Sequence, residues 1–318
     1  MGWNLEVAEY RDVYLTEQDL WRYVQQFLVH SKHTTTYKHI LMKAILESLP
    51  EIDDSGRVDF LVISRHVAKI YWNLVIKYGL RQINSTKSDS GIEEMLKGIQ
   101  REFQIPSDWH FDKIPQDVQA VIIRKTNAVY KRYVYGSFYT SFNGTIYSFD
   151  KKQEWIKFNP PYIVFLERYK RIIVNLTNYQ LALFLEKFNE SEKVEHILDK
   201  VEFVSMRQSL KEFYQLLMMY GDERCFYCHK PKKTLHVDHF VPWSYVQNDM
   251  LWNFVFACPS CNSSKSNKLA HSMFLTRLLE RNDGWRDFEQ MQLYRDDKLI
   301  AMYNYAIGSG FVHEWVPK

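Results

Sequence analysis

The chain is 318 residues long, enough for about two domains of ordinary size, and 46% of its residues are hydrophobic. Its formal net charge of +3 at pH 7 does not by itself indicate a polyanionic partner. It contains no run of about 18 uncharged apolar residues and no signal peptide at its start, so we expect no membrane association and a cytoplasmic location.

Helical periodicity dominates the first two hundred residues. Apolar side chains recur every three or four positions, which places them on one face of each helix. Thr16 and Asp19 have the spacing of an N-terminal capping box for the first helix. The patterns predict helices over residues 20–28, 40–49, 67–78, 92–103, 115–135, 161–173 and 178–189. The packing signal is weakest just before residue 200, where we expect a domain boundary.

Residues 120–175 combine positive charge with aromatic side chains. They contain ten Lys or Arg residues, three acidic residues and thirteen aromatic residues. Basic groups can contact a nucleic-acid backbone while aromatic rings stack on bases, but the same composition also fits a packed core with a solvated basic face. Under the first interpretation, the nucleic-acid contacts come from Arg124, Lys125, Arg132, Lys151 and Lys152.

A β-hairpin is predicted inside this basic stretch. Asn143 and Gly144 stand between two β-prone runs, residues 137–142 and 145–149. The Asn-Gly dipeptide tolerates the positive φ angles of a type I′ turn. Such a hairpin would form a sheet edge on the helical core or a wing beside a nucleic-acid groove.

All four cysteines lie in one segment, as two Cys-x-x-Cys pairs separated by 29 residues. Each pair holds two sulfurs at a separation that suits a tetrahedral Zn²⁺ ion, and four thiolates close the coordination shell, so we expect a structural zinc ion. Unligated or redox-active cysteines are the alternatives, and the paired spacing without a thioredoxin-like βαβ pattern disfavours both. The predicted ligands are Cys225, Cys228, Cys258 and Cys261.

A second motif is interleaved with the cysteines. Asp238-His239 is followed by two apolar residues and a proline; Asn253 lies 14 residues after His239, and Asn262 lies nine residues after Asn253. This pattern resembles that of the HNH endonucleases, including the HNH domain of RNA-guided CRISPR nucleases. The resemblance implies a ββα-metal fold, with strands near residues 234–239 and 254–257 and a helix from Asn262.

The resemblance also implies a role for each residue of the motif. His239 would be the general base that takes a proton from water, and Asn253 would orient it through hydrogen bonds. Asp238 and Asn262 would be ligands of one Mg²⁺ or Mn²⁺ ion, since such hard cations prefer oxygen. Lys265 would contact phosphate near the start of the helix.

Flanking residues resemble those of a prokaryotic HNH subgroup. The resemblance lies in residues 238–244, 251–253 and 262–269, and the subgroup's Thr-Tyr-Lys segment is matched by residues 35–38. Members often lie near mobile elements and anti-phage systems. The resemblance therefore implies the nuclease effector of a defence or restriction system, with a sensor or ATPase as a possible protein partner. Lys268 is a further candidate for nucleic-acid contact.

The chain is thus predicted to be mainly α. A helical domain over residues 1–200, with one β-hairpin, would bind nucleic acid or a partner, and residues 201–318 would form the HNH domain with its four-cysteine zinc site and flanking helices. We expect a metal-dependent endonuclease that cleaves DNA, with RNA as an open alternative. The competing hypothesis is a non-catalytic, zinc-stabilised module that binds nucleic acid or docks a partner. A single HNH site cuts one strand, so a double-strand break would require a homo-oligomer or two successive nicks.

Overall fold

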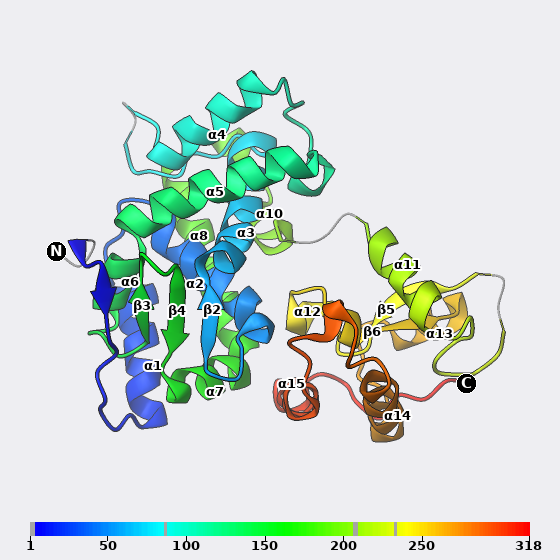
Figure 1. Cartoon of the computed structure of the whole chain (residues 1–318). Coiled ribbons are helices and arrows are strands. Elements are labelled where there is room, and N and C mark those ends of the chain that lie inside the picture. Colours follow the sequence, from blue (N-terminus) through cyan, green and yellow to red (C-terminus); the bar gives the residue numbers. More distant parts are fainter. Residues whose placement is uncertain (1–3, 86–87, 206–208, 232–233) are drawn as a thin grey trace. The chain divides into compact units, whose positions relative to one another are not determined.

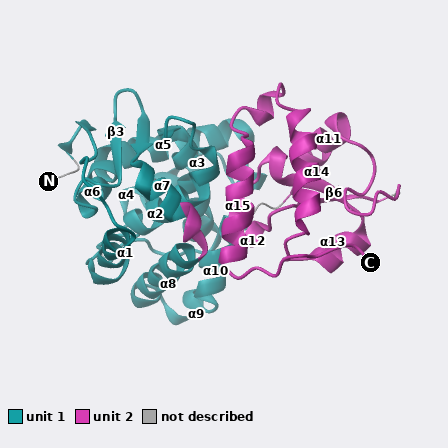
Figure 2. Ribbon diagram, turned by 90° about the horizontal axis from the view of Figure 1, so that it is seen from below, with its two compact units in different colours: residues 1–166, 172–206 teal, residues 167–171, 207–318 magenta. Residues whose placement is uncertain are grey.

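The structure is a computed structural model that describes residues 4–318 apart from residues 86–87, 206–208 and 232–233 (Figure 1). The described residues are mainly helical, as predicted, and include two small sheets. The chain divides into two compact units (Figure 2): unit 1 comprises residues 1–166 and 172–206, and unit 2 comprises residues 167–171 and 207–318. No described helix combines the length and the hydrophobicity that a membrane span requires.

Unit 1 is built around α2 (Tyr37–Ser48), in which every residue from 39 to 48 is buried. A helix that is buried on all sides lies at the centre of a core. α3 (Phe60–Tyr71) packs against α2, and α5 (Gln116–Tyr133) packs against α3. The other α-helices with all or most of their residues in this unit are α1 (Glu17–Gln25), α4 (Gly91–Glu102), α6 (Tyr135–Ser141), α7 (Pro160–Arg168), α8 (Lys170–Phe188), α9 (Ser191–Val194) and α10 (Ile197–Phe203).

The capping box at the start of α1 is confirmed, since the Asp19 amide donates to Thr16 Oγ1 at 3.2 Å. The predicted break between residues 173 and 178 is wrong, because α8 runs through it. Two polar residues at this place are buried in the helix with their hydrogen bonds satisfied. Thr177 donates to the carbonyl of Ile173 at 2.7 Å, and Asn178 accepts a hydrogen bond from Lys43 at 3.0 Å.

The sheet of unit 1 contains four antiparallel strands in the order β1-β3-β4-β2. The strands are β1 (Val7–Ala8), β2 (Arg57–Asp59), β3 (Tyr147–Asp150) and β4 (Trp155–Phe158). β3 and β4 form the one hairpin of this sheet that joins consecutive strands, with Tyr147 opposite Phe158. The sheet is small, and most of the core of unit 1 is formed by helices.

The predicted position of the hairpin is wrong. Residues 137–141 belong to α6 instead of a strand, and the turn of the real hairpin lies at residues 151–154. Asn143 and Gly144 do have positive φ angles, of 51° and 71°, but they follow the end of α6. Phe138 and Phe142 lie one helical turn apart and pack on Phe27, with ring centroids 5.0 and 5.2 Å away. This burial on one helical face outweighs the strand preference of the aromatic residues.

Unit 2 contains a β-hairpin with a short helix packed on it. β5 (His236–His239) pairs antiparallel with β6 (Phe254–Ala257), and α13 (Pro259–Lys265) packs on both strands. The predicted ββα arrangement is therefore present, and α13 begins three residues before the predicted start. The other α-helices of unit 2 are α11 (Lys211–Tyr220), α12 (Trp243–Val246), α14 (Ser272–Asp283) and α15 (Asp296–Gly308).

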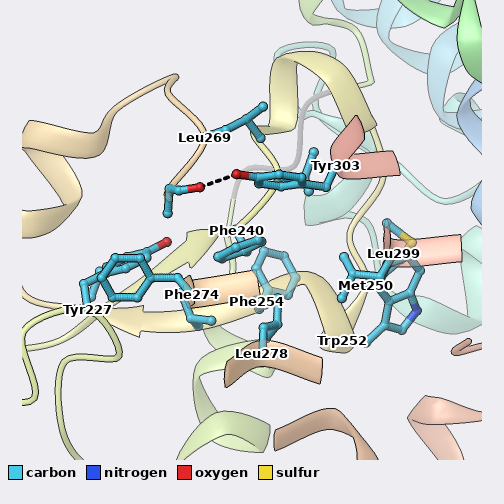
Figure 3. Close-up of a cluster of buried hydrophobic side chains, with 14 of the residues drawn as sticks. Tyr227, Phe240, Met250, Trp252, Phe254, Leu269, Phe274, Leu278, Leu299 and Tyr303 are labelled. Carbon is cyan, nitrogen blue, oxygen red and sulfur yellow. Dashed lines mark hydrogen bonds between the residues drawn. The ribbon is translucent and has the colours of Figure 1, made fainter. Parts of the chain in front are cut away.

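An apolar core fixes the helices of unit 2 around the hairpin. Phe240 and Phe254 come from the hairpin and its loop, Leu278 comes from α14, and all three are fully buried (Figure 3). Tyr303 of α15 donates its hydroxyl hydrogen to the carbonyl of Ala270 at 2.6 Å, which ties α15 to the segment after α13 (Figure 3). The hairpin and α13 therefore rest on a packed scaffold.

Candidate metal centres and catalytic residues

The four cysteines converge in space. Their Sγ atoms all lie within 4.8 Å of one another, and the sulfurs of Cys228 and Cys258 are 4.0 Å apart. None of the four forms a disulfide bond. Sulfurs at about 2.3 Å from a tetrahedral zinc ion are separated by roughly 3.8 Å. The cluster is therefore compatible with a structural zinc ion.

The electrostatics of the cluster also fit a bound cation. Burial raises the pKa of the thiols of Cys225 and Cys261. Burial acts in the same direction on Cys258, but hydrogen bonds with the other three cysteines lower its pKa to about 7. Four sulfurs at this distance cannot all ionise without a cation, because each thiolate repels its neighbours.

Two tight turns bring the sulfurs together. In the first turn, His229 has a φ angle of 56° and its amide donates to the carbonyl of Cys225 at 2.8 Å. In the second, Cys258 is the N-cap residue of α13, and the amide of Asn262 donates to the Cys258 carbonyl at 2.9 Å. Because Asn262 directly follows Cys261, the second turn also fixes the position of Asn262.

One face of β5 is directed toward α13. Side chains alternate along a strand, so His236 and Asp238 share this face. Lys265 on α13 places its Nζ atom 3.0 Å from Asp238 Oδ2, and the hydroxyl of Tyr227 donates to the same oxygen at 2.6 Å. Asp238 is 8% exposed and Lys265 is fully buried. This end of the face is therefore closed to solvent.

The position of Lys265 differs from the phosphate contact that its place in the motif implied. Its Nζ atom donates to the carbonyl of His239 at 2.8 Å as well as contacting Asp238. Burial lowers the pKa of Lys265, and the charge of Asp238 opposes that shift. In this arrangement Lys265 holds the end of β5 in place, and its ammonium group does not reach the surface.

The other end of the same face is open to solvent. Asn262 lies one helical turn before Lys265, and its Nδ2 atom is 3.3 Å from Nδ1 of the exposed His236. Rotation of the Asn262 amide by half a turn would direct its oxygen to the same point. This surface of β5 and α13 therefore carries the buried carboxylate of Asp238 at its closed end, and the side chains of Asn262 and His236 at its open end.

His239 occupies the last position of β5, and its side chain has a different environment. Its ring lies against Phe254, with centroids 4.4 Å apart, and its Nε2 atom is 2.9 Å from Asp249 Oδ1. His239 and Asp249 are partly exposed, at 13% and 15% of their side-chain surface. A carboxylate bonded to one imidazole nitrogen fixes the orientation of the ring. Asp249 was not predicted from the sequence, because it occupies no position of the motif. The only signal for it is an acidic residue in the loop between His239 and Asn253.

Asn253 is fully buried and contacts the main chain just after His239. Its side-chain amide donates to the carbonyl of Val241 at 3.0 Å, and its oxygen accepts from the Val241 amide at 2.9 Å. The carbonyl of Asn253 also accepts from the amide of Phe240 at 2.8 Å. Asn253 therefore fixes the path of the loop that leaves His239 and makes no hydrogen bond to the imidazole.

The basic residues named as nucleic-acid contacts are divided between the two units. Lys268 is in unit 2, where its Nζ atom donates to the carbonyl of Ser264 at 2.7 Å. The other five are in unit 1, and Lys125 among them is exposed. The remaining four line a single groove: Arg124, Arg132, Lys151 and Lys152.

The ββα hairpin and the adjoining cysteine cluster together define a compact metal-binding unit. A family model described as HNH endonuclease matches residues 225–268, which include all four cysteines, both strands and α13. Comparison with curated proteins and comparison with solved structures gave no match. The chain thus carries an HNH endonuclease domain with a four-cysteine cluster, which indicates a nuclease and a nucleic-acid substrate.

Proposed function

We propose that residues 201–318 form the catalytic domain of a metal-dependent HNH endonuclease that hydrolyses phosphodiester bonds in DNA. One observation supports the proposal above the others. Asp238 and Asn262 are turned toward the same β5–α13 surface, and His239, the residue after Asp238, is oriented by a carboxylate. A metal-assisted hydrolase needs these two elements, a cation site and an oriented base.

In this proposal each residue has a separate task. His239 accepts a proton from the attacking water, and Asp249 keeps its ring in one orientation. Asn253 positions the loop that follows His239. Lys265 positions Asp238 and the carbonyl of His239 from inside the unit.

Asp238 and Asn262 would hold the catalytic cation, and we propose His236 as a third donor beside Asn262. A bound Mg²⁺ or Mn²⁺ ion supplies neutralisation of the phosphate and of the departing oxygen. Imidazole nitrogen suits Mn²⁺ better than Mg²⁺, so His236 favours Mn²⁺ as the cofactor. The zinc ion proposed at the four cysteines would be structural, because four thiolates leave no open position.

One observation favours the competing function, a zinc-stabilised module without catalysis. The ammonium group of Lys265 already neutralises Asp238 inside the unit. A carboxylate with a buried partner has less charge to offer a divalent ion. Under this alternative the unit would bind nucleic acid or a protein partner, and the His239 side chain would have no effect on the bound strand.

The biological setting that we propose is a prokaryotic defence or restriction system. It is supported by the subgroup resemblance of residues 238–244 and 262–269, and by the segment at residues 35–38. In the structure this segment is partly buried: the carbonyl of Tyr37 accepts from Tyr130 at 3.0 Å, and Lys38 donates to Ser141 at 2.8 Å. A sensor or ATPase partner for residues 1–200 belongs to the same proposal.

Cleavage of supercoiled plasmid by the full chain with Mg²⁺ or Mn²⁺ tests the catalytic proposal. His239→Ala should slow cleavage by about 10²- to 10⁴-fold, which is the usual contribution of a general base. His313→Ala, at an exposed histidine of unit 2, is the matched control and should cleave like wild type. Tight plasmid binding without cleavage, equal in wild type and His239→Ala, would instead support the non-catalytic module.

A further inference from the structure

A groove of about 950 Å³ on unit 1 is lined by residues of α5 and of the turn between β3 and β4. Five basic and two acidic side chains line it. Glu154 pairs with Lys131, and Glu6 pairs with Lys151. The other three basic side chains, Arg124, Arg132 and Lys152, are exposed and form no ion pair with any described residue.

The three unpaired basic side chains come from two sides of the groove. Arg124 and Arg132 lie eight residues apart on α5, so their Cα atoms are separated by about 12 Å along the helix. Lys152 comes from the β3–β4 turn, where its amide donates to Asp150 Oδ1 at 2.8 Å. One side of the groove is thus a regular helix and the other is a hydrogen-bonded turn, so the backbone positions of these three residues are set by the fold.

The β3–β4 turn contains a residue with a strained backbone, which its contacts hold in place. Glu154 has a φ angle of 61°, a conformation that costs energy for any residue except glycine. Its carbonyl accepts from the amide of Phe60 at 2.8 Å, and its carboxylate contacts Asn127 and Lys131. These contacts hold the turn against α3 and α5, and Lys152 lines the groove from this turn.

The floor of the groove is apolar. Leu61 is 44% exposed there, and Ala128 lies between Arg124 and Arg132 on the same face of α5. A surface with cations in a row and an apolar floor suits a ligand that alternates phosphates with sugars. Phosphates of one DNA strand advance about 3.4 Å along the duplex axis, so about 12 Å corresponds to three to four nucleotide steps of a duplex that runs along α5.

We propose that this groove binds the sugar-phosphate backbone of duplex DNA, so that unit 1 supplies a sequence-independent contact to the DNA that unit 2 cuts. The inference rests on the proposed nuclease function for the identity of the polymer. Backbone contacts of this kind fix position and register on a duplex but carry no sequence preference. The groove would therefore raise affinity for every duplex alike.

The test is fluorescence anisotropy of a labelled duplex of about 30 base pairs with the full chain. All proteins carry His239→Ala, so that the duplex stays intact, and no chelator is added, so that zinc is retained. We compare Arg124→Gln/Arg132→Gln with Lys187→Gln/Lys193→Gln, an equally charged pair on the exposed faces of α8 and α9. The groove variant should bind roughly tenfold more weakly, and its plot of log affinity against log salt should lose about two units of slope. The control pair should match its parent.

Equal affinity and equal salt slope in the two variants would overturn the inference. The same proteins are also tested with vesicles of anionic phospholipid. If the groove variant loses binding to the vesicles but binds the duplex like the control pair, the inference is overturned as well. The outcome is separable from the nuclease proposal. If the chain binds DNA through the groove but never cuts it, the groove inference stands and the nuclease proposal fails. If the chain cuts DNA and the groove variant binds as tightly as the control pair, the nuclease proposal stands and the groove inference fails.

Discussion

The ammonium group of Lys265 neutralises Asp238 in the interior of unit 2. A divalent ion at Asp238 would have to share that carboxylate with an ammonium group. The net negative charge of the site is therefore lower than the charge of Asp238 alone. We expect weak binding of the cation without nucleic acid, because phosphate oxygens must supply the missing negative charge.

His236 should set the preference between Mn²⁺ and Mg²⁺. Because imidazole suits Mn²⁺ and Mg²⁺ prefers oxygen, His236→Ala should raise the Mn²⁺ concentration for half-maximal cleavage about tenfold or more and leave the Mg²⁺ value nearly unchanged. Metal titrations of plasmid cleavage measure both values, with His313→Ala as the control. An equal change for both ions would show that His236 is not a ligand.

Asp249 should act through His239 alone. Asp249→Asn should slow cleavage by about ten- to a hundredfold, because the imidazole loses the group that orients it. The double variant His239→Ala/Asp249→Asn should cleave no more slowly than His239→Ala, since a positioning residue has no effect once its base is gone. Asp222→Asn, at an exposed acid of unit 2, is the control. Additive losses in the double variant would contradict the positioning role.

At the residue scale, the spacing of the motif identified candidate site residues but did not predict their burial or their hydrogen-bond partners. The spacing pointed to His239 and Asn262 as members of a site, and their roles remain predictions. The burial of Lys265 and the contact of Asp249 depend on which face of α13 meets β5 and on the course of the loop before Asn253. Neither is a local property of the sequence.

At the scale of elements, the cysteine cluster joins the segment before the hairpin to β6 and to the start of α13. The amide of Phe226, between the first two cysteines, donates to the carbonyl of Phe256 on β6 at 2.8 Å. The second cysteine pair caps α13 and precedes Asn262. Loss of the cluster would thus loosen β6 and α13 together.

Cys258→Ser should reduce bound zinc from about one ion per chain to nearly none, and it should lower or abolish the thermal transition of unit 2. The reason is that the binding energy of a structural zinc ion is part of the folding free energy. Zinc analysis and calorimetry of the full chain measure the two effects. Ser260→Ala changes an exposed residue of the same turn and serves as the control. A stable, zinc-loaded Cys258→Ser protein would contradict the assigned ligand set.

Local patterns predicted most of the helices but misplaced the hairpin of unit 1. Asn143 and Gly144 adopt the left-handed conformations that the turn rule predicts, yet they follow a helix. This segment is a helix because Phe138 and Phe142 are buried against Phe27, which requires helical spacing between them. The π-helical continuation of α1 at Gln26–His30 likewise has no signal in the periodicity. Both features depend on contacts between residues that are far apart in the sequence, so local sequence patterns do not predict them.

A buried ion cluster joins α2 to α3 in unit 1. Lys43 lies 3.5 Å from Glu47, and His66 lies 3.3 Å from Glu47 and 2.7 Å from Glu51. Burial alone would raise the pKa of Glu47, but Lys43 and His66 lower it below its ordinary value. Burial alone would lower the pKa of His66, but hydrogen bonds to Glu47 and Glu51 raise it above its ordinary value.

The raised pKa of His66 predicts that unit 1 loses stability as the pH rises. The folded chain binds this proton more tightly than the unfolded chain, so the stabilisation is complete below the ordinary pKa near 6.5 and disappears as the pH rises through the folded value. From about pH 6 to about pH 8 the thermal midpoint of unit 1 should fall more in wild type than in His66→Gln, by roughly 4 °C or less for each kcal/mol. His196→Gln, at an exposed histidine, should behave like wild type. An identical pH dependence in wild type and His66→Gln would refute this assignment.

At the scale of the whole molecule, the two proposed activities belong to different units. The groove lies on unit 1, and the proposed cation site lies on unit 2. We retain the division at residue 200 as a proposal about function, with binding assigned to residues 1–200 and hydrolysis to residues 201–318. No spacing motif marks the groove in the sequence, because its two walls come from segments that meet only through the folding of the sheet and α5.

The central claim is that one unit contains two metal sites with different tasks, a closed structural site and an open catalytic site. Asn262→Ala is the most direct probe, because Asn262 adjoins the zinc ligands in sequence but would serve only the catalytic cation. Zinc content and supercoiled-plasmid cleavage should be measured on the same preparations, with Asn267→Ala as the matched control. We predict about one zinc ion per chain in every protein, and a loss of cleavage in Asn262→Ala alone. Cleavage by Asn262→Ala at the wild-type rate would contradict the claim, as would the loss of its zinc.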